Sequence, residues 1–259
     1  MTTVPWPFPR LIAHRGGGKA APENTLAALA VGRRAGFLGV EVDAMLSRDR
    51  TPYLLHDPEL ERTTNGRGTL AGTGDGELAR LDAGAWFSPD FAGEPLPTLV
   101  AALDRCRALG LWINVEIKPA PGWEVETGGV VGATLAAWQE RQPSAAAALP
   151  RPLLSSFSPE ALEAARRVAP AYPRAWLVER LPEDWKERAR GLGVMAIHCQ
   201  AASLTPDQAR AIKGAGLGLA CYTVNDPTQT QALLAMGVDG LITDNLDLGR
   251  ALADCSLGD

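Results

Sequence analysis

Two short apolar segments carry acidic side chains close to their carboxyl ends. Glu41 and Asp43 alternate with valines in residues 39–45, and Glu116 stands near the end of residues 111–117. In a strand, side chains two positions apart share one face, so these carboxylates would point away from the valines. Two unit charges about 4 Å apart repel by about 4 kcal/mol at an effective dielectric constant of about 20. A divalent cation would remove that repulsion, and ligation by oxygen alone favours Mg²⁺, Ca²⁺ or Mn²⁺ over Zn²⁺.

An interior salt bridge is the alternative interpretation of the same residues. Lys118 shares a strand face with Glu116, and an arginine could pair with Glu41 in a similar way. Such ion pairs would explain a single acidic strand well. The presence of two acidic strands in one chain favours a cation site.

The chain has three histidines, His14, His56 and His198, and each of them ends a predicted strand. Histidine is the usual proton carrier near neutral pH. Cleavage of a phosphodiester requires a base for the nucleophile and an acid for the leaving alkoxide, and His14 and His56 would meet that need. Arg15 would clamp the phosphoryl oxygens with its planar guanidinium, and Lys118 would add a point charge. We interpret His198 as a structural residue.

Short apolar segments alternate with longer helical stretches along most of the chain. Strands are predicted at residues 11–14, 39–45, 52–56, 111–117, 152–157, 175–179, 194–199, 218–224 and 240–243. Helices are predicted at residues 24–36, 98–109, 128–142, 159–168, 183–190, 206–214, 228–236 and 245–253. This alternation predicts a parallel sheet covered by helices, in the α/β class. About eight units fit, which favours a closed (β/α)8 TIM barrel over an open sheet.

One stretch, residues 57–97, interrupts the alternation. It follows the strand predicted at 52–56 and is rich in glycine, threonine and aspartate. A connection of this length is usually functional or forms a small element of its own. We predict a cap beside the active site, inserted after the second strand unit and packed down by Trp86 and Phe87. The whole chain, residues 1–259, is then expected to be one domain.

Two further segments have more than one interpretation. The glycines at 16–18 are followed by Lys19, but no serine or threonine comes next, so the segment does not match a phosphate-binding P-loop. Flexible backbone beside a substrate explains these glycines. Residues 23–25 predict a helix start with Asn24 as the N-cap, and they could equally brace Arg15.

Composition and charge exclude several classes of protein. The net charge is −5 and no run of lysine and arginine occurs, so we expect no nucleic-acid or anionic-membrane partner. No apolar run is long enough for a transmembrane helix. Residues 1–10 contain three prolines and no apolar core of a signal peptide, which favours a cytoplasmic location. Free buried thiols are expected at all four cysteines, which are Cys106, Cys199, Cys221 and Cys255.

Taken in order, the polar motifs resemble those of the glycerophosphodiester phosphodiesterases in their soluble bacterial form. The motifs are His14-Arg15-Gly16, Pro22-Glu23-Asn24-Thr25, Glu41-Val42-Asp43, His56-Asp57 and Glu116-Ile117-Lys118. Shorter matches follow at Thr64-Asn65-Gly66, Gly68-Thr69, Pro97-Thr98-Leu99, Tyr222-Thr223-Val224-Asn225 and Thr243-Asp244. The resemblance spans nearly the whole chain, and the ordered set is much more specific than any one motif.

The resemblance implies a TIM barrel with an inserted cap and one divalent cation, Mg²⁺ or Ca²⁺ with Mn²⁺ as a further candidate. It implies Glu41, Asp43 and Glu116 as metal ligands and His14 and His56 as the acid–base pair. It also implies Arg15 and Lys118 as phosphate-binding residues. Tyr222 stands where many relatives have tryptophan, so the substrate-binding surface on the glycerol side would be smaller and more polar.

The activity implied is hydrolysis of glycerophosphodiesters, such as glycerophosphocholine and glycerophosphoethanolamine, to an alcohol and sn-glycerol 3-phosphate. The nucleophile would be water or the 2-hydroxyl of glycerol, and either histidine could be the base. A phospholipase C- or D-like lipid hydrolase would explain the same motifs, but it would need an apolar rim or a membrane-binding helix. A non-catalytic barrel that binds glycerophosphodiesters would also fit them, and so would a TIM-barrel enzyme of unrelated chemistry.

Overall fold

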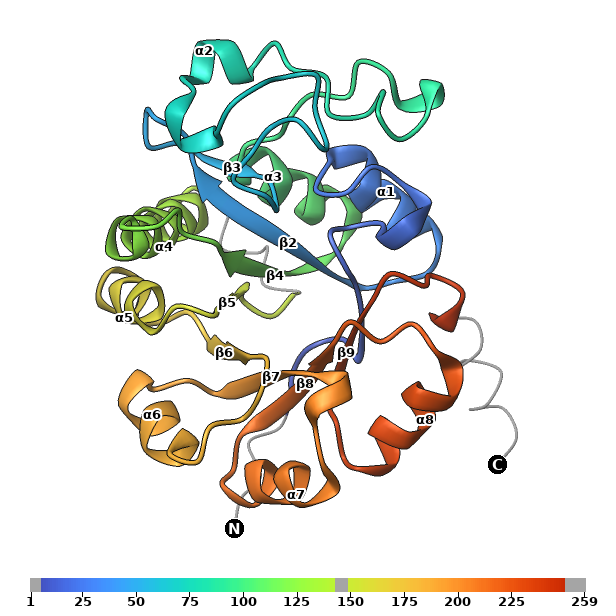
Figure 1. Cartoon of the computed structure of the whole chain (residues 1–259), viewed down its shortest axis with the longest axis vertical. Helices are drawn as coiled ribbons and strands as arrows, with labels where there is room; N and C mark the ends of the chain where they lie inside the picture. The colour runs from blue at the N-terminus through green and yellow to red at the C-terminus, as the bar shows by residue number, and fades with distance from the viewer. Residues whose placement is uncertain (1–5, 143–148, 250–259) are drawn as a thin grey trace.

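The computed structural model describes residues 6–142 and 149–249, which form a closed barrel of strands with helices around it (Figure 1). Strands pair in the order β1-β9-β8-β7-β6-β5-β4-β2, and β1 pairs with β2 to close the ring. All of these pairings are parallel. The predicted (β/α)8 TIM barrel is therefore confirmed.

The observed elements lie close to the predicted ones. The strands are β1 (Leu11–Ala13), β2 (Gly39–Leu46), β3 (Pro52–Leu54), β4 (Trp112–Ile117), β5 (Leu153–Ser156), β6 (Arg174–Val178), β7 (Ala196–Gln200), β8 (Gly218–Tyr222) and β9 (Gly240–Thr243). The helices are α1 (Leu26–Arg34), α2 (Asp75–Leu78), α3 (Leu99–Leu109), α4 (Glu124–Glu140), α5 (Pro159–Val168), α6 (Trp185–Leu192), α7 (Pro206–Gly214) and α8 (Pro227–Ala235). The end of the helix predicted at 245–253, and Cys255, lie outside the described residues.

Small polar side chains start most of the outer helices. A side-chain oxygen accepts a hydrogen bond from the backbone three residues on at Thr25, Thr98, Ser158, Thr205 and Asp226. The prediction that Asn24 caps α1 is wrong, because Thr25 has that role. Asn24 adopts a left-handed backbone with φ of +59° and turns its side chain toward Asp43 instead.

The barrel interior has an apolar layer near the amino ends of the strands and a polar layer near their carboxyl ends. The apolar cluster consists of Phe8, Ile12, Trp112, Leu153, Ala175, Ala196 and Ile242. In β2, Val40 and Val42 pack outward among the core residues that face the helices. Because side chains alternate along a strand, Glu41 and Asp43 point into the barrel. The apolar layer thus closes the floor beneath the polar one.

The third predicted strand exists but does not belong to the parallel barrel. β3 pairs with the outer half of β2 in the antiparallel direction, with Leu46 opposite Pro52 and Ala44 opposite Leu54. Only residues 47–51 connect the two strands. A parallel crossover needs a dozen residues or more, so a connection of this length can only form a hairpin. The hairpin returns the chain toward the barrel mouth, which places His56 there.

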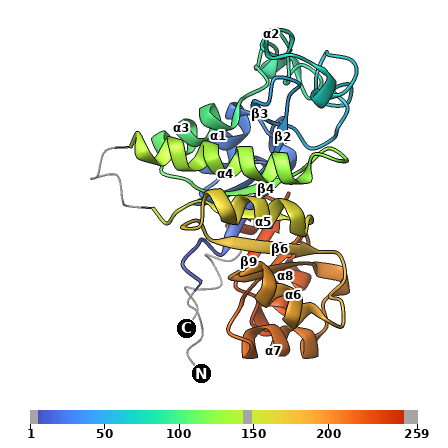
Figure 2. The ribbon, with the colours of Figure 1, turned by 90° about the vertical axis from the view of Figure 1, so that its left-hand side faces the viewer.

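Residues 57–97 form a small cap of their own at one end of the barrel (Figures 1 and 2). The cap contains η2 (Leu70–Gly72), α2 and η3 (Pro89–Phe91). Its apolar cluster joins cap residues to the β2–β3 hairpin and consists of Met45, Tyr53, Leu55, Leu60, Leu70, Leu78, Ala83 and Leu96. The prediction that Trp86 and Phe87 pack the cap down is wrong for Trp86, which is exposed; Phe87 is half-buried against Phe91 but lies outside the apolar cluster, which consists mainly of leucines.

Among the described residues, no helix combines the length and the apolar character needed to cross a lipid bilayer. Cys106, Cys199 and Cys221 are buried and unbridged within this part of the chain.

Candidate active site

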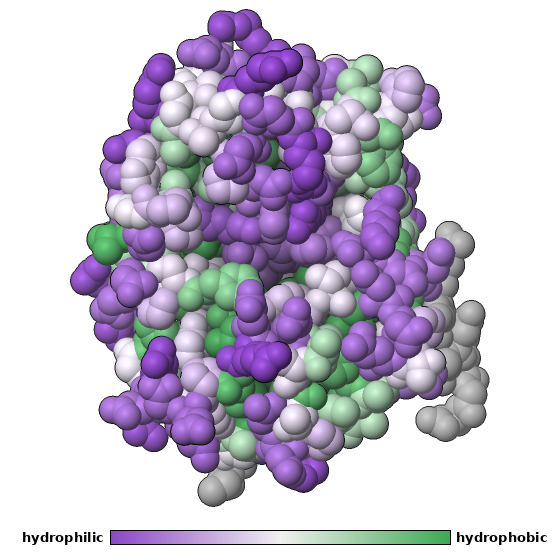
Figure 3. Space-filling view, viewed as in Figure 1, coloured by the Kyte–Doolittle hydropathy of each residue, from purple (hydrophilic) through white to green (hydrophobic). Residues whose placement is uncertain are grey.

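All eight residues singled out as site residues line one cavity at the carboxyl ends of the strands. The cavity has a volume of about 230 Å³, and the eight are His14, Arg15, Glu41, Asp43, His56, Glu116, Lys118 and Tyr222. Figure 3 shows a hollow near the centre of this face, and the residues around it are mainly hydrophilic. The barrel topology has therefore brought together residues that are spread over most of the chain.

Three carboxylates meet on the wall formed by β2 and β4. In the β2–β4 register Asp43 lies beside Glu116, and one carboxylate oxygen from each of Glu41, Asp43 and Glu116 lies within 4.8 Å of the others. Glu41 and Asp43 are buried. The Oε1 atom of Glu41 is buried and has no hydrogen-bond partner within the described residues. This donor set fits a hard divalent cation.

The charges of these carboxylates are poorly balanced by protein groups alone. Burial and the negative charge of Asp43 raise the pKa of Glu41 to about 7. Burial and the same neighbour also raise the pKa of Glu116. Burial acts on Asp43 as well, but the positive charges of Lys118, His56 and Arg15 outweigh it and lower the Asp43 pKa. One carboxylate is thus held ionised between two that favour protonation, which is the electrostatic pattern that a cation would relieve.

The ion pairs considered as an alternative are present in part. The Nζ atom of Lys118 lies 3.6 Å from Asp43 Oδ1 and 3.9 Å from Glu116 Oε1. The guanidinium of Arg15 lies 3.6 Å from Asp43 Oδ2. These contacts are long, and they leave Glu41 without a cationic side chain of lysine or arginine as a close partner in the described part of the chain. Lys118 and Arg15 also line the cavity, where they can meet an anionic substrate.

Arg15 is fixed by bonds from both its backbone and its side chain. It adopts a left-handed backbone with φ of +51°, and its amide donates to Glu41 Oε2 at 3.1 Å. Its Nη1 donates to Glu23 Oε1 at 2.7 Å. Asn24 supports the same region, because its Oδ1 accepts from the Asp43 amide at 3.0 Å and its Nδ2 donates to Asp43 Oδ2 at 2.8 Å. Residues 23–25 therefore both start α1 and brace the site.

The glycines before Lys19 have a packing role. A Cβ on Gly18 would lie 2.2 Å from the carbonyl oxygen of Asp244, and Gly18 has φ of +53°. The Lys19 amide donates to the same carbonyl at 3.0 Å. Glycine is needed here because the loop after β1 packs directly on the backbone that follows β9. This finding agrees with the view that the segment is not a P-loop.

Each cavity histidine is oriented by a carboxylate. His14 Nδ1 lies 2.7 Å from Asp244 Oδ1, and His56 Nδ1 lies 2.6 Å from Asp57 Oδ1. Burial lowers the pKa of His14, but the Asp244 hydrogen bond and the Glu41 charge outweigh it, so the pKa is raised. Burial lowers the pKa of His56, and the attraction of Asp43 and Asp57 does not restore it.

Sequence reasoning assigned no role to Asp244, although one observation could have found it. Asp244 directly follows the last strand, so it must lie at the same end of the barrel as His14. Its other oxygen accepts from Asn225 Nδ2 at 3.1 Å, which fixes the carboxylate from the second side. A polar residue just beyond any barrel strand is a candidate for the site.

Aromatic and polar side chains complete the cavity wall. Tyr222 packs edge-on against Phe157 with ring centroids 5.8 Å apart, and its hydroxyl donates to the Val178 carbonyl at 3.0 Å. Asn114 and Ser155 line the cavity with buried polar atoms that have no protein partner in the described chain. Sequence reasoning missed Phe157 and Ser155 as cavity residues.

His198 is separate from the cavity. It is fully buried inside the barrel, and burial lowers its pKa to about 3. Its ring lies 6.3 Å from the ring of Trp6, on the side of the apolar floor. This placement agrees with the interpretation of His198 as a structural residue.

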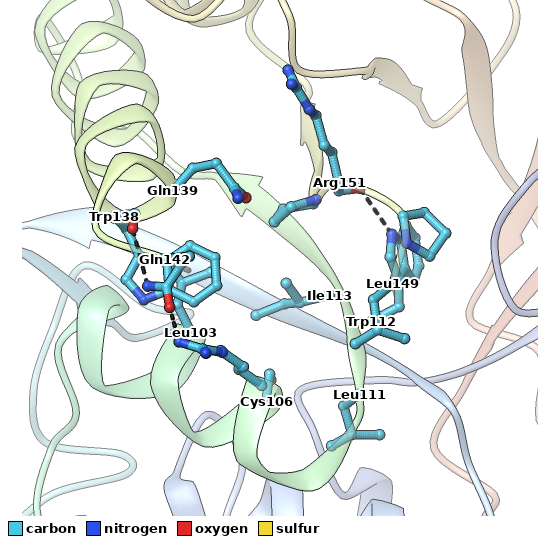
Figure 4. Close-up of a pocket in the computed structure, with 13 residues that line it drawn as sticks. Leu103, Cys106, Leu111, Trp112, Ile113, Trp138, Gln139, Gln142, Leu149 and Arg151 are labelled. Carbon is cyan, nitrogen blue, oxygen red and sulfur yellow. Dashed lines mark hydrogen bonds between the residues drawn. The ribbon is translucent and has the colours of Figure 1, made fainter. Parts of the chain in front are cut away.

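A second cavity lies at the other end of β4, between α3 and α4 (Figure 4). Its polar side chains bond to neighbouring groups: Trp112 Nε1 donates to the Arg151 carbonyl at 3.1 Å, and Gln142 Nε2 donates to the Trp138 carbonyl at 3.0 Å. No carboxylate or histidine is among the described residues that line it. The cavity at the carboxyl ends of the strands, which is lined by carboxylates and histidines, is therefore the candidate active site.

The chain is similar to known proteins over most of its length. The model of the glycerophosphoryl diester phosphodiesterase family matches residues 14–248. A glycerophosphodiester phosphodiesterase of Caldanaerobacter subterraneus subsp. tengcongensis is 31% identical over 240 residues, covering 91% of this chain and 93% of that protein. A glycerophosphodiester phosphodiesterase of Bacillus subtilis is 28% identical, covering 92% of this chain and 84% of that protein.

Solved structures agree as well. An Oleispira antarctica phosphodiesterase in complex with the product sn-glycerol-3-phosphate has a TM-score of 0.88 and 34% identity, covering 95% of this chain and 97% of that chain. A glycerophosphodiester phosphodiesterase of Agrobacterium tumefaciens has a TM-score of 0.77 and 26% identity, covering 94% of this chain and 100% of that chain. The chain belongs to the glycerophosphoryl diester phosphodiesterase family of enzymes.

Proposed function

We propose that this enzyme hydrolyses glycerophosphodiesters such as glycerophosphocholine and glycerophosphoethanolamine to an alcohol and sn-glycerol 3-phosphate, with one divalent cation bound. The observation that carries the proposal is the meeting of three carboxylates and two carboxylate-bound histidines in one cavity. The family membership and the product complex of the Oleispira antarctica relative support the same reaction.

Glu41, Asp43 and Glu116 would hold the cation. The buried and unpartnered Oε1 of Glu41, together with the raised pKa of Glu41, supports this role because the protein alone compensates that charge only in part. A bound Mg²⁺, Ca²⁺ or Mn²⁺ supplies positive charge that stabilises the negative charge developing on the phosphoryl group.

His14 and His56 would transfer the protons. Because Asp244 and Asp57 bind the Nδ1 atoms, each histidine has its Nε2 available for substrate, and that of His14 lies 3.9 Å from Glu41 Oε2. One Nε2 accepts the proton of the nucleophile, and the other donates a proton to the leaving alkoxide oxygen. The nucleophile is water, which gives glycerol 3-phosphate directly, or the 2-hydroxyl of glycerol, which expels the alcohol and forms a cyclic phosphate that water then opens.

Arg15 and Lys118 would bind the phosphoryl oxygens. Arg15 is held by Glu41 and Glu23, so its guanidinium enters the cavity already oriented. Lys118 adds a second positive charge beside the carboxylates. Tyr222 and Phe157 would pack against the carbon skeleton of the substrate on the opposite wall.

The test is an assay of metal-stripped and cation-reconstituted protein on a panel of glycerophosphodiesters, with coupled detection of glycerol 3-phosphate. We expect activity only with an added divalent cation, and preferentially on glycerophosphodiesters over lysophospholipids. Release of free glycerol would show that the other P–O bond is cleaved. Full activity after exhaustive chelation would contradict the metal role, and preference for lysophospholipids would favour the lipid-hydrolase interpretation.

A further inference from the structure

Arg62, a residue of the cap, makes ion pairs with two carboxylates at the cavity mouth. Its Nη1 and Nη2 donate to Glu23 Oε2 and Oε1 at 2.9 and 2.8 Å, which is a bidentate pair. Its Nε donates to Asp57 Oδ2. All three nitrogen positions of one guanidinium are therefore used, and they join segments that are far apart in the sequence.

Each of these carboxylates also holds a cavity residue. Glu23 Oε1 accepts from Arg15 Nη1 at 2.7 Å, and Asp57 Oδ1 lies 2.6 Å from His56 Nδ1. The result is a continuous chain of contacts that runs from Arg15 through Glu23, Arg62 and Asp57 to His56. A guanidinium suits the central position because its flat fork fixes both the distance and the angle between two carboxylates.

We propose that Arg62 is a positioning residue that fixes the phosphate-binding Arg15 and the proton-transferring His56 relative to each other, through Glu23 and Asp57. The inference rests on the proposed function, because that function assigns the roles of Arg15 and His56. It gives the cap a task in the site, which is to align two sides of the cavity.

Because Arg62 is partly exposed, its ion pairs should matter for the geometry of the site more than for the stability of the fold. Its side chain is 44% exposed, and ion pairs with that much solvent contribute little to global stability. The cap is instead held by its own apolar cluster, in which Leu78 is fully buried. Loss of Arg62 should therefore disturb the geometry of the cavity much more than the fold.

The experiment compares Arg62→Ala and Arg62→Lys with two control variants from the cap. Arg80→Ala removes an exposed cap arginine for which the described residues give no ion pair, and Leu78→Ala loosens the cap core. For Arg62→Ala we expect kcat/KM on glycerophosphocholine to fall about 10- to 100-fold, because a misplacement of about 1 Å can cost 10²-fold in rate. Arg62→Lys should recover little of this activity, since an ammonium lacks the flat fork that makes the bidentate pair with Glu23 and sets the angle to Asp57.

Three readouts distinguish positioning from a structural effect. Added guanidinium ion at millimolar concentration should partly restore Arg62→Ala, because the vacated site is open to solvent, and should leave Leu78→Ala unchanged. Glu23→Gln should mainly raise KM, and Asp57→Asn should mainly lower kcat, whereas Arg62→Ala should do both. The Tm of Arg62→Ala should stay within about 4 °C of wild type, while that of Leu78→Ala should fall further.

The inference is overturned if Arg62→Ala keeps the wild-type kcat/KM. It is also overturned if the loss follows a fall in Tm like that of Leu78→Ala and guanidinium gives no rescue, since Arg62 would then only fasten the cap. A wild-type enzyme without diesterase activity, or a His56→Ala variant with full activity, would instead overturn the proposed function and this inference with it.

Discussion

The raised pKa of Glu41 predicts that, without a cation, this carboxylate destabilises the fold at neutral pH. The unfolded chain would ionise Glu41 near its ordinary pKa of 4.5, whereas the folded protein does so only at about 7. Below pH 4.5 both states are protonated, so the residue has no net effect. Between these pH values the unfolded state loses its proton first, and stability falls as the pH rises.

The size of the effect follows from the two pKa values. At about 1.4 kcal/mol for each tenfold change, ionised Glu41 costs the metal-free fold about 3 kcal/mol above pH 7. Little solvent screening applies, because Glu41 is only 3% exposed. For a chain of this size the difference corresponds to roughly 6–12 °C in Tm. A cation at a concentration of 100 times its Kd would stabilise the folded state by about 2.7 kcal/mol.

Calorimetry of wild type and of Glu41→Gln can measure how much ionised Glu41 lowers the stability of the metal-free fold. In EDTA, the variant should be more stable than wild type by roughly 6–12 °C at pH 8, and the two should converge toward pH 4. Added Mg²⁺, Ca²⁺ or Mn²⁺ should raise the Tm of wild type at pH 8 much more than that of the variant. The difference between the two proteins cancels the titrating groups that do not interact with Glu41, and it includes the effect of the Glu41 charge on His14 and Glu116.

Two results would refute this reasoning. One is a Tm difference between wild type and Glu41→Gln in EDTA that does not change with pH. The other is an equal gain in Tm from the cation in both proteins, which would place the cation site away from Glu41.

The remaining predictions concern the histidines. His14→Ala and His56→Ala should each lower kcat on glycerophosphocholine by about 10²- to 10⁴-fold with folding intact by circular dichroism, and a wild-type rate in both would remove them from the mechanism. Asp244→Asn should lower the pKa of His14, because the Asp244 hydrogen bond helps to raise it, and should lower kcat by on the order of 10²-fold or more; NMR titration of His14 and steady-state kinetics check both. His198 has a pKa of about 3 when folded against 6.5 when unfolded, so the fold should lose stability as the pH falls below 6.5. The His198→Leu variant should not show this loss, which amounts to about 2 kcal/mol at pH 5. If the Tm of wild type and that of the variant fall equally between pH 6.5 and pH 5, His198 is not the cause.

Much of the fold could be predicted from the sequence because each strand and helix has a recognisable local pattern of apolar and polar residues. The alternation of apolar segments with helical stretches gave the barrel, and five small polar residues mark where the outer helices begin. The errors were in direction and packing. Residues 52–56 have the pattern of a strand, and the short connection after β2 allows only antiparallel pairing, a constraint that the alternation of strands and helices alone does not show.

The acidic and histidine residues of the site could also be proposed from the sequence, because their residue types and their positions on strands limit the chemistry. Their supports could be proposed only in part: residues 23–25 could be expected to brace Arg15, but the contacts of Asp244 and Arg62 could not. Asp244 is 230 positions from His14, and Arg62 is 39 positions from Glu23. Each of these pairs depends on loops that pack against each other only in the closed barrel. A local pattern can mark a residue such as Asp244 as a candidate by its place after a strand, but it does not show which side chain that residue contacts.

The sequence by itself determined which side chains face the barrel interior and at which end of the strands they lie, because strand periodicity is a property of neighbouring residues. Tertiary structure alone decided the pKa values of these groups and the way in which they orient one another. The pKa values of Glu41 and His14 depend on burial and on partners from distant strands. Electrostatic energies vary with distance and solvent exposure, and both quantities exist only once the ring of strands has closed.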